Sequence, residues 1–337
     1  MPRITIDVRG SRPLLDLVSF GRKGPGRRDR LSSVDIEHIR RTIDRTPEVM
    51  VKVLSKGGQD PKAVSRHLDY LSRRGDLELE TDDGERIAGK DAQKSLLEDW
   101  GLDLDDSRRR TGLLPRQDSR PPKLVHKVMF SMPAGTPGGK VLQAVRKFAI
   151  EEFALQHRFA LVLHTDEPHP HVHMVVKAIS EQGERLNIRK DTLRRWRAEF
   201  ARHLRALGLP ANATERAVRG QSHGTKPDGI YRALRRGESS HMATRIIEVS
   251  DAVAQGRIQR ELGKATMTET RSAVTRGWLR VSELLNDQGE SELAARVRGF
   301  VDAFQPPLTE REFIAEQLRY QVAQQRTGSI DGCARPR

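Results

Sequence analysis

Apolar and polar positions along the middle of the chain follow two different periods. Apolar residues at helical spacing predict helices at 60–75, 140–156 and 192–208. Short apolar runs typical of buried strands predict strands at 49–55, 123–133, 158–165 and 171–180. The last two strands are separated only by a short turn, so we expect them to pair as an antiparallel hairpin. The pattern therefore predicts an α+β fold in which helices pack on an antiparallel sheet.

The two ends of the chain differ from this middle part. Residues 1–44 are basic and contain the Gly- and Arg-rich run GRKGPGRRDR, which predicts a flexible arm with one short helix at VDIEHIRRTI. Residues 45–235 are predicted to form the main domain, with an exposed loop at 104–122 that is rich in turn-forming and charged residues. Residues 236–337 are almost continuously helix-forming and predict a C-terminal helical region with a disordered tail.

The charge balance indicates a polyanionic partner. The chain of 337 residues has 60 Lys and Arg against 46 Asp and Glu, which gives a formal net charge of +14 and a pI near 10.3. Such an excess attracts polyanions, so nucleic acid is the leading expectation and an acidic membrane surface the second. A basic protein with no such partner is the simpler alternative.

The compartment is expected to be the cytoplasm. Cys333 is the only cysteine, which leaves no disulfide framework and no cysteine zinc site. The N-terminal stretch has no apolar core of the kind that a secretory leader needs. No apolar run reaches the roughly 18 residues of a spanning helix, so we expect no membrane insertion.

Four of the eleven histidines lie close together in the stretch HTDEPHPHVHMVVK. Because side chains alternate along a strand, His171 and His173 are expected to share a face, and a hairpin would bring His164 beside them. Neutral imidazoles are common ligands of divalent metals, so these three are the expected metal ligands, with His169 in the turn nearest solvent. Asp166 could accept a ring N–H and fix its tautomer. Ordinary histidines on a strand edge are the alternative.

The pattern H-x-D-x-x-H-P-H-x-H, followed by apolar residues, resembles the third motif of conjugative relaxases. These belong to the HUH endonucleases, named for two histidines that flank a hydrophobic residue, and the match is closest to the MobP group, which includes the IncP plasmid relaxases and the T-DNA border endonucleases. The resemblance implies an HUH-type antiparallel sheet and a divalent ion, Mg²⁺ or Mn²⁺. Lys177 stands where many members have Asn.

A nucleophilic tyrosine is expected upstream of the histidines. Of the three tyrosines, Tyr70 lies in HLDYLSRRGDLELETDDGE, which is similar to the family's first motif; Tyr231 is the second candidate, and Tyr320 has no supporting signal. The resemblance implies site- and strand-specific nicking at a transfer origin, with a 5′-phosphotyrosyl adduct that initiates conjugative transfer or mobilisation. A phenol ordinarily has a pKa of about 10, so a base is needed. Asp166 or His169 could supply it, and His67 is close in sequence to Tyr70.

A basic segment further along could contact DNA. Its cationic residues cluster at the start of a predicted helix and are Arg189, Lys190, Arg194 and Arg195. A solvated helix face is the alternative interpretation of the same residues.

The expected partners are single-stranded DNA at a transfer origin, relaxosome accessory proteins and a type IV secretion coupling protein. Two other functions share part of the pattern. HUH replication initiators and transposases usually have the tyrosine after the histidines, and a non-catalytic, metal-stabilised DNA-binding accessory protein would form no covalent adduct.

Overall fold

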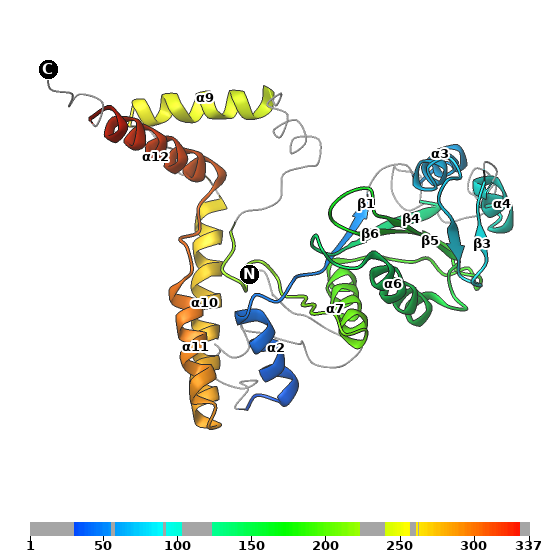
Figure 1. Ribbon diagram of the computed structural model, residues 1–337, viewed down its shortest axis with the longest axis horizontal. Coiled ribbons are helices and arrows are strands. Elements are labelled where there is room, and N and C mark those ends of the chain that lie inside the picture. The colour runs from blue at the N-terminus through cyan, green and yellow to red at the C-terminus, as the bar shows by residue number, and fades with distance from the viewer. Residues whose placement is uncertain are drawn as a thin grey trace, which may run out of the picture. The chain divides into compact units, whose positions relative to one another are not determined.

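The computed structural model describes residues 30–54, 58–89, 92–102, 123–222, 240–256, 261 and 263–330. Contacts within the chain divide it into two compact units, whose main parts are Val34–Thr214 and Glu215–Arg337. The first unit combines a sheet with helices and the second is helical (Figure 1). The predicted α+β class with an antiparallel sheet and a C-terminal helical region is confirmed. The predicted domain boundaries stay predictions, and the loop expected at 104–122 lies outside the described residues.

Six strands form one sheet in the first unit. Their order is β1-β4-β6-β5-β2-β3, and each neighbouring pair is antiparallel. The strands are β1 (Met50–Leu54), β2 (Leu79–Thr81), β3 (Arg86–Ile87), β4 (Val125–Ser131), β5 (Phe159–His164) and β6 (His171–Lys177). All four strands that the apolar runs predicted are present. The β2–β3 hairpin was not predicted, because β2 lies in the acidic segment LELETDDGE, which has no apolar run, and β3 is only two residues long.

One face of the sheet is closed by two helices, α6 (Gly138–Phe153) and α7 (Lys190–Ala206) (Figure 1). The core between them and the sheet is rich in aromatic rings. Phe148 on α6 lies with its ring centroid 5.1 Å from that of Phe130 and 5.9 Å from that of Trp196 on α7. Pairs at such distances add to the stabilisation that burial of the apolar area supplies.

The opposite face is covered by α3 (Pro61–Leu71) and α4 (Ala92–Asp99). Helix α3 begins where the sequence predicted, since Asp60 caps its N-terminus by accepting from the backbone N–H of Ala63 and Pro61 occupies its first turn. It ends at Leu71, four residues before the predicted end. Its buried residues Val64, Leu68 and Leu71 pack with strand residues that point to this face.

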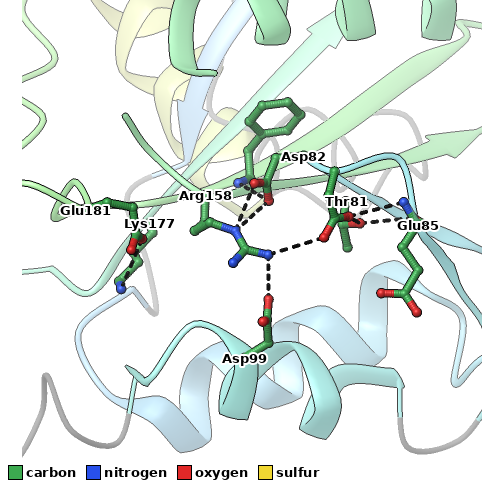
Figure 2. Close-up of polar contacts among 9 residues, drawn as sticks. Thr81, Asp82, Glu85, Asp99, Arg158, Lys177 and Glu181 are labelled. Carbon is green, nitrogen blue, oxygen red and sulfur yellow. Dashed lines mark hydrogen bonds and ion pairs between the residues drawn. The ribbon is translucent and has the colours of Figure 1, made fainter. Parts of the chain in front are cut away.

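An ion-pair network joins α4, the turn between β2 and β3, and the start of β5 (Figure 2). Arg158, next to β5, bridges two carboxylates: its Nε lies 2.8 Å from Asp82 Oδ2 and its Nη2 donates to Asp99 Oδ2 at 2.6 Å. Asp82 lies in the hairpin turn and Asp99 ends α4, so one guanidinium connects three elements of the unit.

The second unit consists of helices, and part of its core surrounds Trp278. This ring is fully buried, and its Nε1 donates to the backbone carbonyl of Val218 at 2.8 Å. The helices assigned from residue 240 onward are α9 (Ser240–Ala254), α10 (Gly263–Asp287), α11 (Ser291–Asp302) and α12 (Glu310–Ile330).

Helix α2 (Ser33–Ile43) precedes β1 in the chain and agrees with the short helix predicted there. Within the described ranges, none of the helices has the length and apolar character needed to cross a membrane.

Candidate metal and nucleophile site

The β5–β6 hairpin brings three imidazoles together. His164 lies directly opposite His171 in the register, and His173 shares a face with both because it is two residues further along β6. The ring centroids of the three lie 4.8–5.2 Å apart, and one nitrogen from each ring falls within 4.8 Å of the others. His164, His171 and His173 could therefore hold a metal ion, whereas His169 lies in the exposed turn before β6.

Backbone carbonyls select the tautomers of two of these rings. His164 Nε2 lies 2.8 Å from the Leu71 carbonyl oxygen, and His171 Nδ1 lies 3.0 Å from the His169 carbonyl oxygen. Because a carbonyl only accepts, each of these nitrogens donates, and the other nitrogen of each ring keeps its lone pair for a ligand. The acceptor expected from the sequence was Asp166. The structure instead pairs Asp166 with Arg73, because the end of α3 brings that guanidinium to the hairpin turn.

The protonation of the cluster favours metal binding. Burial, followed by the charges of neighbouring His164 and His171, lowers the pKa of His173 to about 3. Burial is also the main reason that the pKa of His164 falls below its ordinary value, although its hydrogen bond to Leu71 opposes the shift. These two imidazoles are therefore neutral near pH 7, which is the form that ligates a divalent cation.

Tyr70 lies in the last turn of helix α3, next in sequence to a residue that is bonded to this cluster. Its side chain is 58% exposed, while the following residue, Leu71, is buried and accepts the hydrogen bond from His164. This bond joins residues 93 positions apart in the chain. The tyrosine predicted as the nucleophile thus projects from a helix whose last turn is bonded to one of the three clustered histidines.

The other tyrosines lie elsewhere. Tyr320 is exposed on α12 in the second unit. Tyr231, the second candidate nucleophile, lies outside the described residues.

Arg73 is a site residue that the sequence did not identify. Its Cζ lies 5.0 Å from the centroid of the Tyr70 ring, and its Nη2 donates to Asp166 Oδ2. A hydrogen bond with Tyr70 is the largest cause of the raised pKa of Arg73. The only sequence signal is the SRRG run after Tyr70, which could equally be a solvated helix end.

The two proton acceptors suggested by the sequence differ in their surroundings. Burial raises the pKa of Asp166, but the hydrogen bond and charge of Arg73 outweigh that effect, and the net pKa is lowered. Asp166 is therefore an ion-paired carboxylate at neutral pH. His169 lies in the exposed turn, and its backbone carbonyl accepts from His171.

Two more polar groups lie on the α3 side of the sheet. Burial, followed by the charge of Lys127, lowers the pKa of His67 to about 4, and its buried Nε2 has no hydrogen-bond partner among the described residues. Lys127 is opposite Val175 in the register and therefore points to the same face as His173. It is 5% exposed, and burial is the main cause that lowers its pKa to about 8. No pattern in the sequence pointed to Lys127.

The basic residues expected to bind DNA lie away from the histidines. They begin α7, which packs on the opposite face of the sheet. Arg195 forms a two-bond ion pair with Glu152, and Arg194 donates to Asp191 at 2.7 Å. Arg189 and Lys190 are exposed. The structure thus divides the four into two exposed cations and two cations that are paired within the fold.

Lys177, at the position where related sequences often have Asn, also lies apart from the cluster. It ends β6, six residues after His171, and its Nζ is 3.7 Å from Glu181 Oε1 (Figure 2). The departure from the motif therefore does not alter the contacts of the three histidines.

A second group with metal-binding potential consists of Glu151, Glu199 and His203, on α6 and α7. Arg202 already donates to both carboxylates, with its Nε 2.7 Å from Glu199 Oε2. The negative charge of this group is therefore largely neutralised within the protein.

Comparison with known proteins finds a similarity to relaxases. Residues 88–209 match the family model described as relaxase, MobA/VirD2-like, nuclease domain. The chain is 29% identical over 195 residues to the T-DNA border endonuclease VirD2 of Rhizobium radiobacter, which covers 51% of this chain and 43% of that protein. It is 26% identical over 230 residues to the enzyme of the same name from Agrobacterium fabrum, which covers 62% and 49%. No solved structure gave a significant match.

The extent of these matches matters for the site. The match to each of these two relatives spans less than half of that protein's length. The family match includes the β5–β6 hairpin and α7 but begins after Tyr70, so it does not bear on the role of Tyr70. Residues 88–209 are thus similar to the nuclease domain of MobA/VirD2-like relaxases.

Proposed function

We propose that this protein is a site- and strand-specific DNA nickase that cleaves at a transfer origin and becomes covalently attached to the DNA. The observation that supports this most directly is the hydrogen bond from His164, one of three clustered histidines, to the carbonyl of Leu71, the residue that follows the exposed Tyr70. A tyrosine near a histidine metal site is suited to attack a phosphodiester, whose negative charge otherwise repels nucleophiles.

In the proposed reaction, the Tyr70 hydroxyl oxygen attacks the phosphorus and forms a new P–O bond. The bond to the 3′ oxygen of the preceding nucleotide breaks, that oxygen takes up a proton, and the 5′-phosphate stays on the tyrosine. The phenol proton goes to a nearby base. Since one phosphate ester replaces another, the reverse reaction can reseal the strand without an external energy source.

His164, His171 and His173 would hold a divalent ion, Mg²⁺ or Mn²⁺. When bound, such an ion supplies Lewis-acid stabilisation of charge on the phosphate oxygens. Of the two expected bases, we propose that the exposed His169 accepts the proton, whereas Asp166 serves mainly as the partner of Arg73. The ion pair and the lowered pKa make the Asp166 carboxylate a weaker base.

We also propose that the exposed start of α7, with Arg189 and Lys190, follows the DNA backbone outside the reacting centre. The adduct would initiate conjugative transfer or mobilisation, with the C-terminal helices available to accessory or secretion partners.

The decisive experiment incubates the full chain with Mn²⁺ and single-stranded DNA from its own mobilisation region. An SDS-stable adduct is expected, and it should disappear in Tyr70→Phe, in His171→Ala and after chelation with EDTA. Tyr320→Phe is the matched control, since Tyr320 is an equally exposed tyrosine in the second unit, and it should form adduct at the wild-type rate. Adduct that persists in Tyr70→Phe would show that another residue is the nucleophile. DNA binding without any adduct would indicate a non-catalytic accessory protein.

A further inference from the structure

The turn that follows Tyr70 has an unusual backbone. Three consecutive residues have positive φ angles, 53° at Arg73, 61° at Arg74 and 95° at Gly75. Glycine adopts this region readily, but arginine does so only at a cost in free energy. Two such arginines in succession are retained only where the surrounding structure determines the conformation.

Hydrogen bonds on both sides hold this turn in place. The Arg74 N–H donates to the Asp69 carbonyl and the Leu77 N–H donates to the Ser72 carbonyl, each at 2.8 Å. Gly75 also approaches the backbone of Gly89 so closely that a Cβ at position 75 would collide with it. The path of the chain after α3 is therefore fixed, and it turns the Arg73 side chain back toward Tyr70.

Arg73 contacts two elements at once. Its guanidinium lies 5.0 Å from the centroid of the Tyr70 ring, and it donates to Asp166 in the turn of the histidine hairpin. The adjacent Arg74 has the same backbone conformation, but it is exposed and makes no described side-chain contact. Only one of two neighbouring arginines therefore reaches the site.

We propose that Arg73 is a positioning residue for Tyr70, a role that rests on the proposed nicking function. The side chain of Tyr70 is more than half exposed and would otherwise rotate freely. Contact with a guanidinium limits the orientations of the ring and places a fixed positive charge beside the phenol. The pair with Asp166 holds that charge on the hairpin that carries His164 and His171. Arg73 thus connects the nucleophile to the metal site.

A role in binding DNA phosphate would need the charge of the Arg73 guanidinium to be free. The side chain is 33% exposed, but it donates to Asp166, whose carboxylate neutralises that charge. We therefore expect loss of Arg73 to slow cleavage of bound DNA while leaving DNA affinity nearly unchanged.

The kinetic test compares Arg73→Gln with Arg74→Gln under single-turnover conditions at saturating DNA. Arg73→Gln should lower the rate of adduct formation about 10- to 100-fold, the size expected for a misplaced reacting group. Its Kd for single-stranded DNA should change less than about threefold. Arg74→Gln should leave both quantities near wild type, and Arg73→Lys should recover only part of the rate because lysine lacks the planar guanidinium. Equal rates in the two glutamine variants, or a rise in Kd that accounts for the lost rate, would overturn the proposal.

Arg73→Gly separates positioning from folding. Glycine removes the side chain and also relieves the positive φ, so the variant should be at least as stable as wild type in thermal unfolding yet as slow as Arg73→Gln. A variant that regains the wild-type rate would exclude a role for the guanidinium.

A spectroscopic readout makes the test independent of DNA cleavage. The chain has three tyrosines, so protein labelled with 3-fluorotyrosine gives three ¹⁹F signals, and the Tyr70 signal is identified by its loss in Tyr70→Phe. Arg73→Gln should shift and narrow this signal as the ring becomes mobile, while Arg74→Gln should leave it unchanged. An unchanged Tyr70 signal in Arg73→Gln would refute the positioning role, whether or not the wild-type protein forms an adduct. The absence of an adduct with the wild-type protein would refute the proposed function instead.

Discussion

The two faces of the central sheet are built for different purposes. The face under α6 and α7 is closed by aromatic and aliphatic side chains, among them Phe130, Phe148 and Trp196. The face under α3 and α4 has an apolar half, but it also carries the three histidines and the nearly buried Lys127. Polar groups held away from water lower stability unless a partner compensates them.

This contrast indicates how stability and function are divided within the unit. The aromatic face supplies the stability that lets the other face hold neutral imidazoles and a poorly solvated cation. Substitutions in the aromatic core should therefore lower stability and leave metal binding alone. On the other face, loss of a histidine should weaken metal binding, and loss of the Lys127 charge should raise stability. The first three predictions test that division, and the fourth tests the basic start of α7.

The largest effect is expected for Phe148→Ala on the closed face. Removal of a fully buried ring should lower the free energy of unfolding by about 3–5 kcal/mol, because the surrounding rings cannot collapse into the cavity. Urea unfolding measures this loss. The control is Ile150→Ala on the same helix, where the side chain is 48% exposed and a loss below about 1 kcal/mol is expected. Similar losses in the two variants would mean that the aromatic core is not the main source of stability.

Next in size is the effect of His173→Ala on the face under α3 and α4. Loss of one of three ligands should weaken Mn²⁺ binding about 100-fold or more, which corresponds to roughly 2.7 kcal/mol, and calorimetric titration measures it. His169→Ala serves as the control, since this histidine lies in the exposed turn. The affinity of this variant for Mn²⁺ should stay within about threefold of wild type. Equal losses in both variants would place His169 among the ligands.

Lys127→Met should increase stability. The folded pKa of about 8 is below the ordinary value of 10.5, so the unfolded chain binds the proton more tightly and the folded state carries a penalty at pH 7. Removing the charge should raise the free energy of unfolding by about 1–3 kcal/mol at pH 7. This gain should shrink as the pH rises from about 8 through 10.5, where wild-type Lys127 loses its charge in both states. Lys147→Met, at an exposed position on α6, should show neither effect.

The smallest effect is expected at the start of α7. If Arg189 and Lys190 contact phosphates, their replacement by Gln should weaken DNA binding equally for all sequences. For single-stranded DNA, the slope of log affinity against log salt should fall by about 0.7 for each phosphate that the variant no longer neutralises. Fluorescence anisotropy at several salt concentrations measures the slope, with Lys147→Gln as the control. An unchanged slope would leave these residues as a solvated helix face.

Local patterns identified the elements of the site correctly. Apolar runs predicted β4, β5 and β6, and apolar residues at helical spacing predicted α3. The histidine hairpin was also predicted from the sequence, because a short turn and the alternation of side chains determine which residues share a face. The β2–β3 hairpin was missed because it is short and its sequence is acidic rather than apolar.

The secondary structure of the core and the grouping of His164, His171 and His173 could therefore be predicted from the sequence, since both depend on neighbours within a few residues. Packing of the folded unit established what the sequence could not, namely that the end of α3 bonds to His164, that Arg73 joins Tyr70 to Asp166, and that Lys127 is nearly buried. The two hydrogen bonds each join residues 93 positions apart. No local period in the sequence encodes such pairs, because they form only when α3 packs on the sheet. The strained turn after Tyr70 then directs Arg73, and not Arg74, toward the histidine hairpin.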